Sequence, residues 1–167
     1  MSQASPHTSA DRVRAALARL GHDVPFRTFS ESTKTSADAA AAIGCSVGQI
    51  AKSLVFRGAE SQRAVLVIAS GANRVDERKV AGLIAEPVGR ADADFVRART
   101  GFAIGGVAPV AHAEPLTILI DEDLMTLPEI WAAAGHPNTV FKLAPADLVK
   151  MTGGRVAAVK SEESNSR

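Results

Sequence analysis

The chain has 167 residues, of which 46% are apolar and 22% are charged, and 19 Lys and Arg against 18 Asp and Glu leave a net charge of +1. This composition predicts one domain with one core and disfavours a protein that coats nucleic acid by charge alone. The sequence has no apolar run of the roughly 18 residues that a membrane span needs, and its start lacks the order of a signal peptide, so we expect a cytoplasmic protein. The single cysteine, Cys45, excludes an internal disulfide and a zinc ribbon.

Both ends of the sequence are polar and lack apolar periodicity. We therefore expect disordered tails at 1–8 and 160–167, on either side of a single domain at 9–159. Between the tails there is no repeat, no low-complexity block and no internal linker, which agrees with one domain.

Within the domain, helices are predicted where apolar residues recur at helical spacing between capping residues and glycines, and strands where β-branched runs are bounded by turns. Ser36 is the predicted N-cap of an alanine-rich helix, and Ser46 with Gln49 forms a capping-box pair. The alternation of predicted helices and strands along the chain predicts an α/β (α+β) domain with a mixed sheet. In chain order we expect a helix at 9–20, an extended segment at 24–30, a helix at 35–43, a short helix from 46, a strand hairpin of 54–56 and 64–69, helices at 76–84 and 92–100, an irregular segment at 101–112, a strand at 116–121, a helix at 128–134, a segment at 139–143, a helix at 145–151 and a last segment at 156–159.

Several functional classes lack their signatures in this sequence. The four histidines have no metal-ligand spacing, and neither a serine nucleophile elbow nor a phosphate-binding P-loop is present, so no metal and no cofactor are expected. Cys45 lies among small and apolar residues and is interpreted as a core residue rather than a nucleophile. Residues 35–54 imitate a helix-turn-helix, but the supposed recognition helix carries one cation, so DNA binding is only a minor alternative.

Lys52 is the first residue that indicates chemistry. It follows the predicted short helix and opens an apolar strand, so its ammonium group would be held at the edge of the core. A lysine in that place is a fixed positive charge for a phosphate, a carboxylate or a developing oxyanion. The alternative is a lysine that only extends its charged end to solvent at a sheet edge.

The irregular segment 101–112 is the second candidate. Gly105, Gly106 and Pro109 interrupt regular structure there, and adjacent glycines let backbone N–H groups approach an anion, as an oxyanion hole requires. The alternative is a plain turn. Gly135 and His136, after the helix expected at 128–134, form a weaker third candidate rim.

Three segments together resemble the YbaK/ProX family of aminoacyl-tRNA deacylases. They are residues 49–56, with the lysine followed by a small polar residue and an apolar strand, residues 100–110, with the Gly-Gly-x-x-Pro loop, and residues 144–148. Their order and spacing match over about 9–159, and Asp76 and Lys79 are similar to the middle of that family. Each motif alone is weak, whereas the pair is moderately specific.

The resemblance implies a single domain with a central mixed, partly barrel-like sheet flanked by helices, and hydrolysis of the ester between a wrong amino acid and tRNA. The family's essential lysine maps onto Lys52, and its glycine loop onto Gly105 and Gly106, which makes these the expected catalytic residues. Where other members have Asn or Thr after the lysine, this chain has Ser53, so the preferred amino acid stays open. The expected substrate-binding residues are Ser53, Val107, Pro109, His112, Gly135 and His136.

The resulting hypothesis is a trans-editing deacylase that removes a small wrong amino acid, most plausibly from proline tRNA. The expected partners are the aminoacyl-tRNA 3′ end and prolyl-tRNA synthetase, with no membrane and no DNA. The net charge predicts few phosphate contacts, for which we consider Arg12, Arg14 and Arg19 or Arg97 and Arg99. The alternative of another class is a non-catalytic module of the same fold that binds aminoacyl-tRNA or a synthetase. No side chain is identified as a general base.

Overall fold

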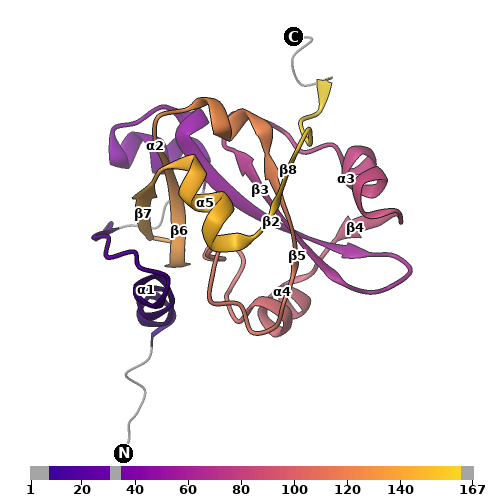
Figure 1. Ribbon diagram of the computed structural model, residues 1–167, viewed down its shortest axis with the longest axis horizontal. Coiled ribbons are helices and arrows are strands. Elements are labelled where there is room, and N and C mark those ends of the chain that lie inside the picture. The colour runs from indigo at the N-terminus through magenta and orange to yellow at the C-terminus, as the bar shows by residue number, and fades with distance from the viewer. Residues whose placement is uncertain (1–7, 31–34, 163–167) are drawn as a thin grey trace, which may run out of the picture.

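The computed structural model describes residues 8–30 and 35–162. Within them one mixed sheet of eight strands has the order β1-β7-β6-β2-β3-β5-β8, and β4 pairs with β2 beside this path (Figure 1). The predicted mixed α/β fold is therefore confirmed. The strands are β1 (Phe26–Thr28), β2 (Ile50–Gly58), β3 (Ala64–Ser70), β4 (Val88–Arg90), β5 (Thr117–Asp121), β6 (Ile130–His136), β7 (Thr139–Leu143) and β8 (Arg155–Ala157).

Most helices begin and end where their caps predict. The carboxylates of Asp76 and Asp92 accept backbone hydrogen bonds at the starts of the third and fourth helices, as expected for N-caps. The alanine-rich helix is capped by Thr35 and not by Ser36, because it is the Thr35 hydroxyl that accepts from the N–H of Asp38, at 3.0 Å. The helices are α1 (Ser9–Arg19), α2 (Ser36–Ile43), α3 (Glu77–Ile84), α4 (Ala93–Thr100) and α5 (Pro145–Thr152), with 3-10 helices η1 (Val47–Gln49) and η2 (Glu122–Thr126).

The helix predicted at 128–134 is wrong, because this segment forms strand β6. Ile130, Ala132 and Ala134 are buried at alternate positions, and β6 pairs with β7 in antiparallel register. An alanine-rich apolar run has helical propensity, but in this fold neighbours on both sides offer it sheet pairing, which overrides that weak preference.

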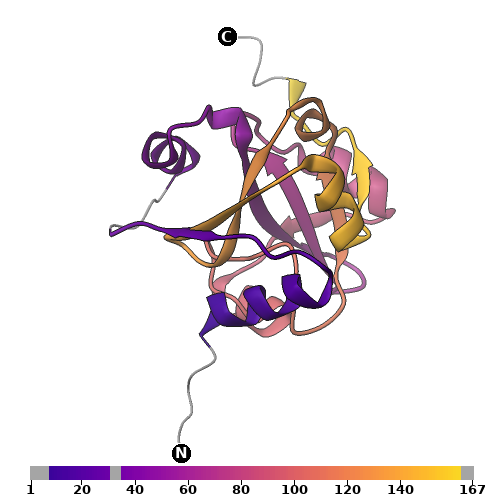
Figure 2. The same ribbon diagram turned by 60° about the vertical axis from the view of Figure 1, so that its left-hand side comes forward.

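The helix-turn-helix alternative is also wrong. Its supposed recognition helix consists of the three-residue η1, and strand β2 begins directly after it at Ile50. Gln49 Oε1 accepts from the N–H of Ser46, at 3.0 Å, and the predicted capping box of Ser46 and Gln49 is confirmed at the start of this single turn. Figure 2 shows α2 at one side of the molecule, away from the other α-helices.

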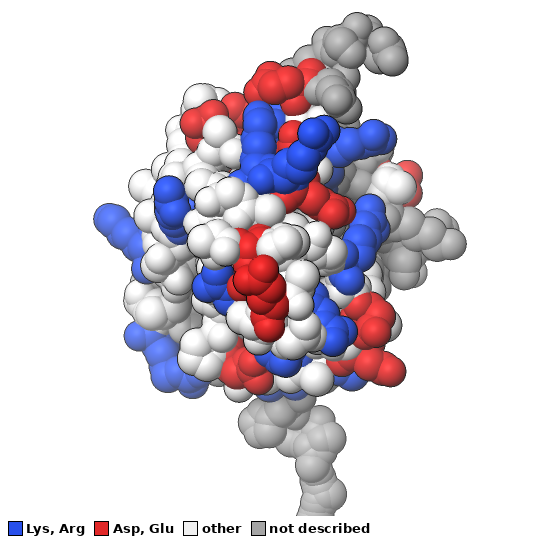
Figure 3. Space-filling view, turned by 90° about the vertical axis from the view of Figure 1, so that its right-hand side faces the viewer, with Lys and Arg blue, Asp and Glu red and all other residues white. Residues whose placement is uncertain are grey.

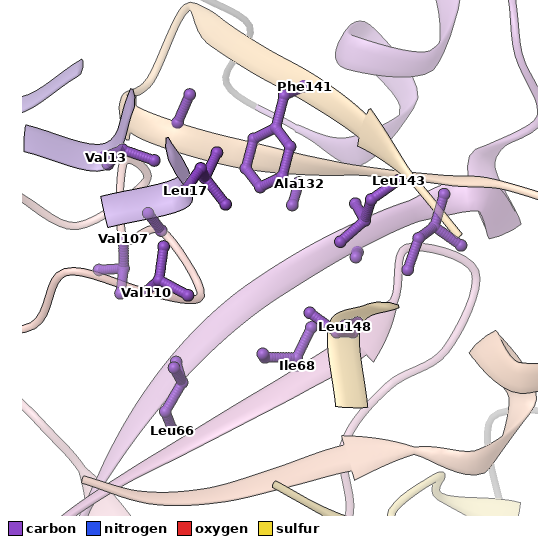
Figure 4. Packing of buried hydrophobic residues seen from close by; sticks show 14 of the residues in the cluster. Val13, Leu17, Leu66, Ile68, Val107, Val110, Ala132, Phe141, Leu143 and Leu148 are labelled. Carbon is purple, nitrogen blue, oxygen red and sulfur yellow. The ribbon is translucent and has the colours of Figure 1, made fainter. Parts of the chain in front are cut away.

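The core fills both faces of the sheet. The larger cluster lies between the sheet and helices α1, α4 and α5, and Figure 4 shows Val13 and Leu17 of α1 facing Phe141 of β7. The second cluster lies on the opposite face, where Val80 and Ile84 of α3 pack against the sheet. Every residue of β3 is buried because β3 runs between these two clusters.

The ends of the described chain contribute to the fold. Thr8 is the N-cap of α1, its hydroxyl accepting from the N–H of Asp11 at 3.1 Å. Lys160 forms an isolated bridge with Val75, and the N–H of Ser161 donates to the carbonyl of Arg74 at 2.7 Å. Residues 160–162 of the expected tail are thus joined to the domain, while residues 1–7 and 163–167 of the two expected tails lie outside the described residues.

A buried carboxylate holds the hairpin between β2 and β3. Glu86 accepts hydrogen bonds from the N–H of Glu60 at 2.9 Å and of Ser61 at 2.8 Å, and from the guanidinium of Arg63 at 3.1 Å. The Ser61 hydroxyl donates to it as well, at 2.6 Å. These bonds, first those from Ser61, lower the pKa of Glu86 to about 2.

This pKa predicts an acid-dependent loss of stability. Because the folded-state pKa lies below that of the unfolded chain, the stabilisation by Glu86 is complete above about pH 4.5 and is lost as the pH falls toward 2. We expect Glu86→Gln to lower the melting temperature at pH 7 and to flatten its decline between pH 5 and pH 3. The matched control is Glu122→Gln, at an exposed carboxylate. Parallel melting curves for wild type and Glu86→Gln over this range would contradict the prediction.

Candidate functional site

A cavity of about 830 Å³ lies beside the middle of β2. Its walls come from residues 52–56 of β2, from the segment 72–75 that follows β3, and from the loop 104–107 that follows α4. The size is within the range of small-molecule sites, about 300–1,000 Å³. Segments that are far apart in the sequence thus meet at one ligand-sized space.

The cavity exists because one edge of β2 is open. On one edge β2 pairs with β3 from Ala51 to Arg57. On the other edge β6 pairs only with Ile50 and Ala51, and β4 pairs only from Phe56 onward. Within residues 8–30 and 35–162, no strand covers residues 52–55 at this edge, and the cavity lies beside that gap.

Lys52 lies in this gap and is half-buried. Burial lowers the pKa of its ammonium group, the nearby carboxylate of Asp121 raises it, and Arg74 lowers it again. Among the described residues no carboxylate lies within ion-pair distance of Lys52 Nζ, 4.0 Å. The charge of Lys52 is therefore held by the fold and is available to a ligand in the cavity.

Asp121 is held in place by its own hydrogen bonds. It is fully buried, and its Oδ2 accepts from the N–H of Ser70 at 3.0 Å and from Nδ2 of Asn73 at 2.8 Å. Asn73 lines the cavity as well and donates a second bond to Asp123. Sequence reasoning missed Asp121 and Asn73, because the chain order does not show that the end of β5 lies under the turn after β3.

Ser53 lines the cavity, but its hydroxyl does not point there. The Oγ of Ser53 is buried without a hydrogen-bond partner among the described residues, although the residue as a whole is partly exposed. Alternation along β2 puts Ser53 on the face of the larger core cluster, with Ala51 and Val55, and Lys52 on the other face. The two neighbours thus border one cavity from opposite faces of the strand.

The glycine segment contributes Gly105 and Val107 to the cavity, whereas Gly106 does not line it. The N–H of Gly106 donates to the carbonyl of Ala103 at 2.9 Å, so it is already engaged in a turn. A Cβ on Gly106 would lie 3.0 Å from the Cα of His136. Gly106 therefore allows the loop to pack directly on the backbone of β6.

The third candidate rim lies next to the glycine loop but does not line the cavity. His136 contacts the loop through its backbone at Gly106, and Gly135 has a φ of +95°. A Cβ on Gly135 would lie 2.7 Å from the carbonyl oxygen of Ser9, which begins α1. The structure thus gives Gly135 a packing role between α1 and β6.

Pro109 and His112 border a different cavity, of about 570 Å³, near the C-terminal end of α1. His112 Nε2 is 2.7 Å from the carbonyl oxygen of Ala108, and burial lowers the pKa of this imidazole. Its ring also meets Phe102 edge-on, at 6.3 Å between centroids. The structure separates these two expected substrate-binding residues from the cavity of Lys52.

Three of the five arginines expected to contact tRNA are engaged elsewhere. Arg12 donates to the carbonyl of Gly101 at 2.7 Å, and Arg14 pairs with Asp11 at 3.2 Å. Arg99 pairs with Glu114 at 3.3 Å. None of the five arginines considered lines the larger cavity.

Two other arginines, Arg74 and Arg90, do line the cavity, and both are exposed. No ion pair of either side chain is found in the described part of the chain. Figure 3 shows that basic and acidic side chains are interspersed on the face near α3 and β4, without a broad basic surface. At the cavity, Lys52, Arg74 and Arg90 thus provide positive charge without an ion pair in the described ranges.

Neither a metal site nor a membrane helix emerges from the described residues. No group of three or more His, Cys, Asp or Glu side chains in residues 8–30 and 35–162 is placed to hold a metal ion. The helices in these ranges are too short or too polar to cross a membrane. Cys45 is partly buried, and burial is the main cause that raises the pKa of its thiol.

The fold and the cavity define a mixed α/β domain with a ligand-sized site at an open strand edge. Comparison with known protein families shows to which family this domain belongs. The model of the aminoacyl-tRNA editing domain matches residues 30–151, and the chain belongs to this family. The match includes Lys52 and the glycine loop and leaves α1 outside.

Individual relatives extend over nearly the whole chain. A crystal structure of a putative trans-editing enzyme for prolyl tRNA synthetase is 44% identical, with a TM-score of 0.87 over 95% of this chain and 99% of that chain. The structure of hypothetical protein APE2540 is 28% identical, with a TM-score of 0.83 over 90% of this chain and 99% of that one. The uncharacterized protein YwhH of Bacillus subtilis (strain 168) is 29% identical over 148 residues, 89% of this chain and 94% of its own length.

The packing role of Gly135 gives a stability prediction. Gly135→Ala adds a Cβ both at a positive φ and against the carbonyl of Ser9, whereas Gly21→Ala adds it at a φ of +88° with no atom within 4 Å. We expect Gly135→Ala to lower the free energy of unfolding by about 1–3 kcal/mol more than Gly21→Ala, the typical cost of overpacking. Urea unfolding of both variants measures the difference, and equal losses would show that Ser9 does not constrain this position.

Proposed function

We propose that this protein hydrolyses the ester of proline tRNA that carries a small wrong amino acid. The observation that carries the proposal is the half-buried Lys52, held without an ion-pair partner among the described residues in a cavity at the open edge of β2. Membership of the aminoacyl-tRNA editing domain family supports the substrate class. The tRNA is suggested by the 44% identical relative described as a putative trans-editing enzyme for prolyl tRNA synthetase.

The two sides of the cavity suit the two parts of this substrate. Val55, Val96 and Val107 provide an apolar wall for a small side chain. Lys52, Arg74 and Arg90 provide positive charge for the phosphates of the tRNA 3′ end. A second, hydrolytic site is useful because the binding pocket of a synthetase discriminates poorly between similar amino acids. Two side chains that differ by one methylene differ in binding free energy by only about 1–3 kcal/mol.

The reaction proposed needs little from the protein beyond position and charge. Water attacks the carbonyl carbon and negative charge develops on the carbonyl oxygen, and the bond to the ribose oxygen then breaks as the carbonyl re-forms. Lys52 stabilises that charge or holds the neighbouring phosphate. A hydroxyl of the tRNA or the substrate itself orients the water, so this chain's own contribution is electrostatic.

The function is tested with a panel of proline tRNA charged with alanine, cysteine, serine, threonine or 2-aminobutyrate, alongside correctly charged prolyl-tRNA. We expect the ester of at least one small wrong amino acid to be lost faster than in buffer, while prolyl-tRNA survives. Binding without any loss of ester across the panel would instead favour the alternative, a non-catalytic module that binds aminoacyl-tRNA or a synthetase.

Lys52→Ala tests the charge at the site. We expect kcat to fall by at least about 10²-fold, the typical effect of removing one electrostatic stabiliser, with an unchanged melting temperature. The control is Lys142→Ala, at a lysine on β7 whose Nζ lies 3.6 Å from Glu129 outside the cavity. Turnover near wild type in a folded Lys52→Ala protein would refute the assigned role.

The arginines predict a salt dependence. Each phosphate contact to a single strand contributes about 0.7 to the slope of log affinity against log salt, so replacing both Arg74 and Arg90 by alanine should make the slope shallower by about 1.4. Titration of uncharged tRNA at several salt concentrations measures it. The control replaces Arg14 and Arg99, which pair with Asp11 and Glu114. An equal change of slope in both double variants would show that Arg74 and Arg90 make no more phosphate contacts than arginines outside the cavity.

A further inference from the structure

The open edge of β2 presents backbone groups whose direction follows from two hydrogen bonds. The N–H of Gly71 donates to the carbonyl of Ile50 at 2.7 Å, and the N–H of Gly58 donates to the carbonyl of Arg63 at 2.9 Å. Both pairs fit the register of β2 with β3. In an antiparallel pair the residues that bond to the partner strand alternate, so even-numbered residues of β2 direct their N–H groups to β3 and odd-numbered residues direct theirs to the opposite edge.

At that opposite edge Ser53 has no strand partner in the part of the chain that the structure describes. The parallel register with β6 ends at Ala51, and the register with β4 begins only at Phe56. No backbone hydrogen bond from Ser53 to another loop is found among the described residues. The N–H of Ser53 therefore points into the gap that the cavity fills.

The exposure of Ser53 agrees with this direction. The residue lines the cavity and is partly exposed, yet its hydroxyl oxygen is hidden on the core side. The part of Ser53 that a ligand can reach is thus main chain and Cβ rather than the hydroxyl. The side chains of Lys52 and Ser53 lie on opposite faces of β2, and both residues line the cavity. The cavity therefore extends from one face of the strand to the other, past the peptide group that joins these two residues.

One of the two donors expected in the glycine loop, the N–H of Gly106, is not available to a ligand. An oxyanion hole needs N–H groups that are not already engaged, and the N–H of Gly106 donates to Ala103. Gly106 also lies outside the cavity lining.

We propose that the N–H of Ser53, at the open edge of β2, donates a hydrogen bond to the carbonyl oxygen of the ester and to the oxyanion that forms from it; this rests on the proposed function. The oxygen of water bonds to the carbonyl carbon and releases a proton to solvent, the bond from that carbon to the ribose oxygen breaks, and the ribose oxygen takes a proton from solvent. With the carbonyl at the edge, the amino-acid side chain lies toward Val107, and the ribose and phosphate lie on the side of Lys52 and Arg74.

Replacement of one backbone N–H by oxygen tests this proposal. Lactic acid is the α-hydroxy analogue of alanine, and translation in vitro with a suppressor tRNA can incorporate either at position 53. The two proteins, Ser53→Ala and its ester counterpart, differ only in the N–H. We expect the ester form to have a kcat about 10²–10³-fold lower than Ser53→Ala, the typical cost of one oxyanion donor. We expect a similar affinity for uncharged tRNA in both.

The outcomes separate this inference from the function on which it rests. Equal kcat values in the two forms, while both hydrolyse the mischarged tRNA, would overturn the role of the Ser53 N–H and leave the deacylase intact. Absence of hydrolysis by the wild-type chain would refute the proposed function itself. Melting temperatures within a few degrees of each other show that the two forms share one fold, as expected for an N–H without a partner in the sheet.

Discussion

β2 is paired along one edge from Ala51 to Arg57, but on its other edge β6 meets only its first residues and β4 only its last. A strand inside a sheet normally has both edges satisfied, and a buried N–H without a partner is unfavourable. Here the gap at residues 52–55 is open to a cavity, so those groups can be hydrated or bind a ligand. The remaining parts of the site are arranged around this gap.

The electrostatics of the site depend on the same arrangement. Lys52 extends from the side of β2 that faces Asp121, and the carboxylate favours its charged form while burial opposes it. Ser70 and Asn73 hold Asp121 through hydrogen bonds, which places the negative charge near Lys52 without direct pairing. A cation held in this way is desolvated in part and free to act on a ligand, which a lysine in a surface ion pair is not.

Much of the fold followed from local signals. The caps Asp76 and Asp92 determine where α3 and α4 begin, and Gly101 determines where α4 ends; both helices were predicted with nearly correct boundaries. Strand β6 was not, because an alanine-rich apolar segment has the same composition in a helix and in a buried strand, and only its neighbours decide. Likewise, Lys52 was identified from its place before an apolar strand, whereas Arg74 and Arg90 stood in polar segments with no distinguishing pattern.

By itself the sequence determined the mixed α/β class, the position of Lys52 at the start of an apolar run and the irregular glycine segment, because propensity, capping and hydrophobic spacing act over a few residues. The tertiary structure alone decided which of these segments meet. It directed Gly106 and Gly135 to backbone packing, separated His112 from the cavity of Lys52, and exposed the edge of β2 at Ser53. Those outcomes depend on strand order and register, which are set by contacts between residues distant in the chain and leave no local pattern in it.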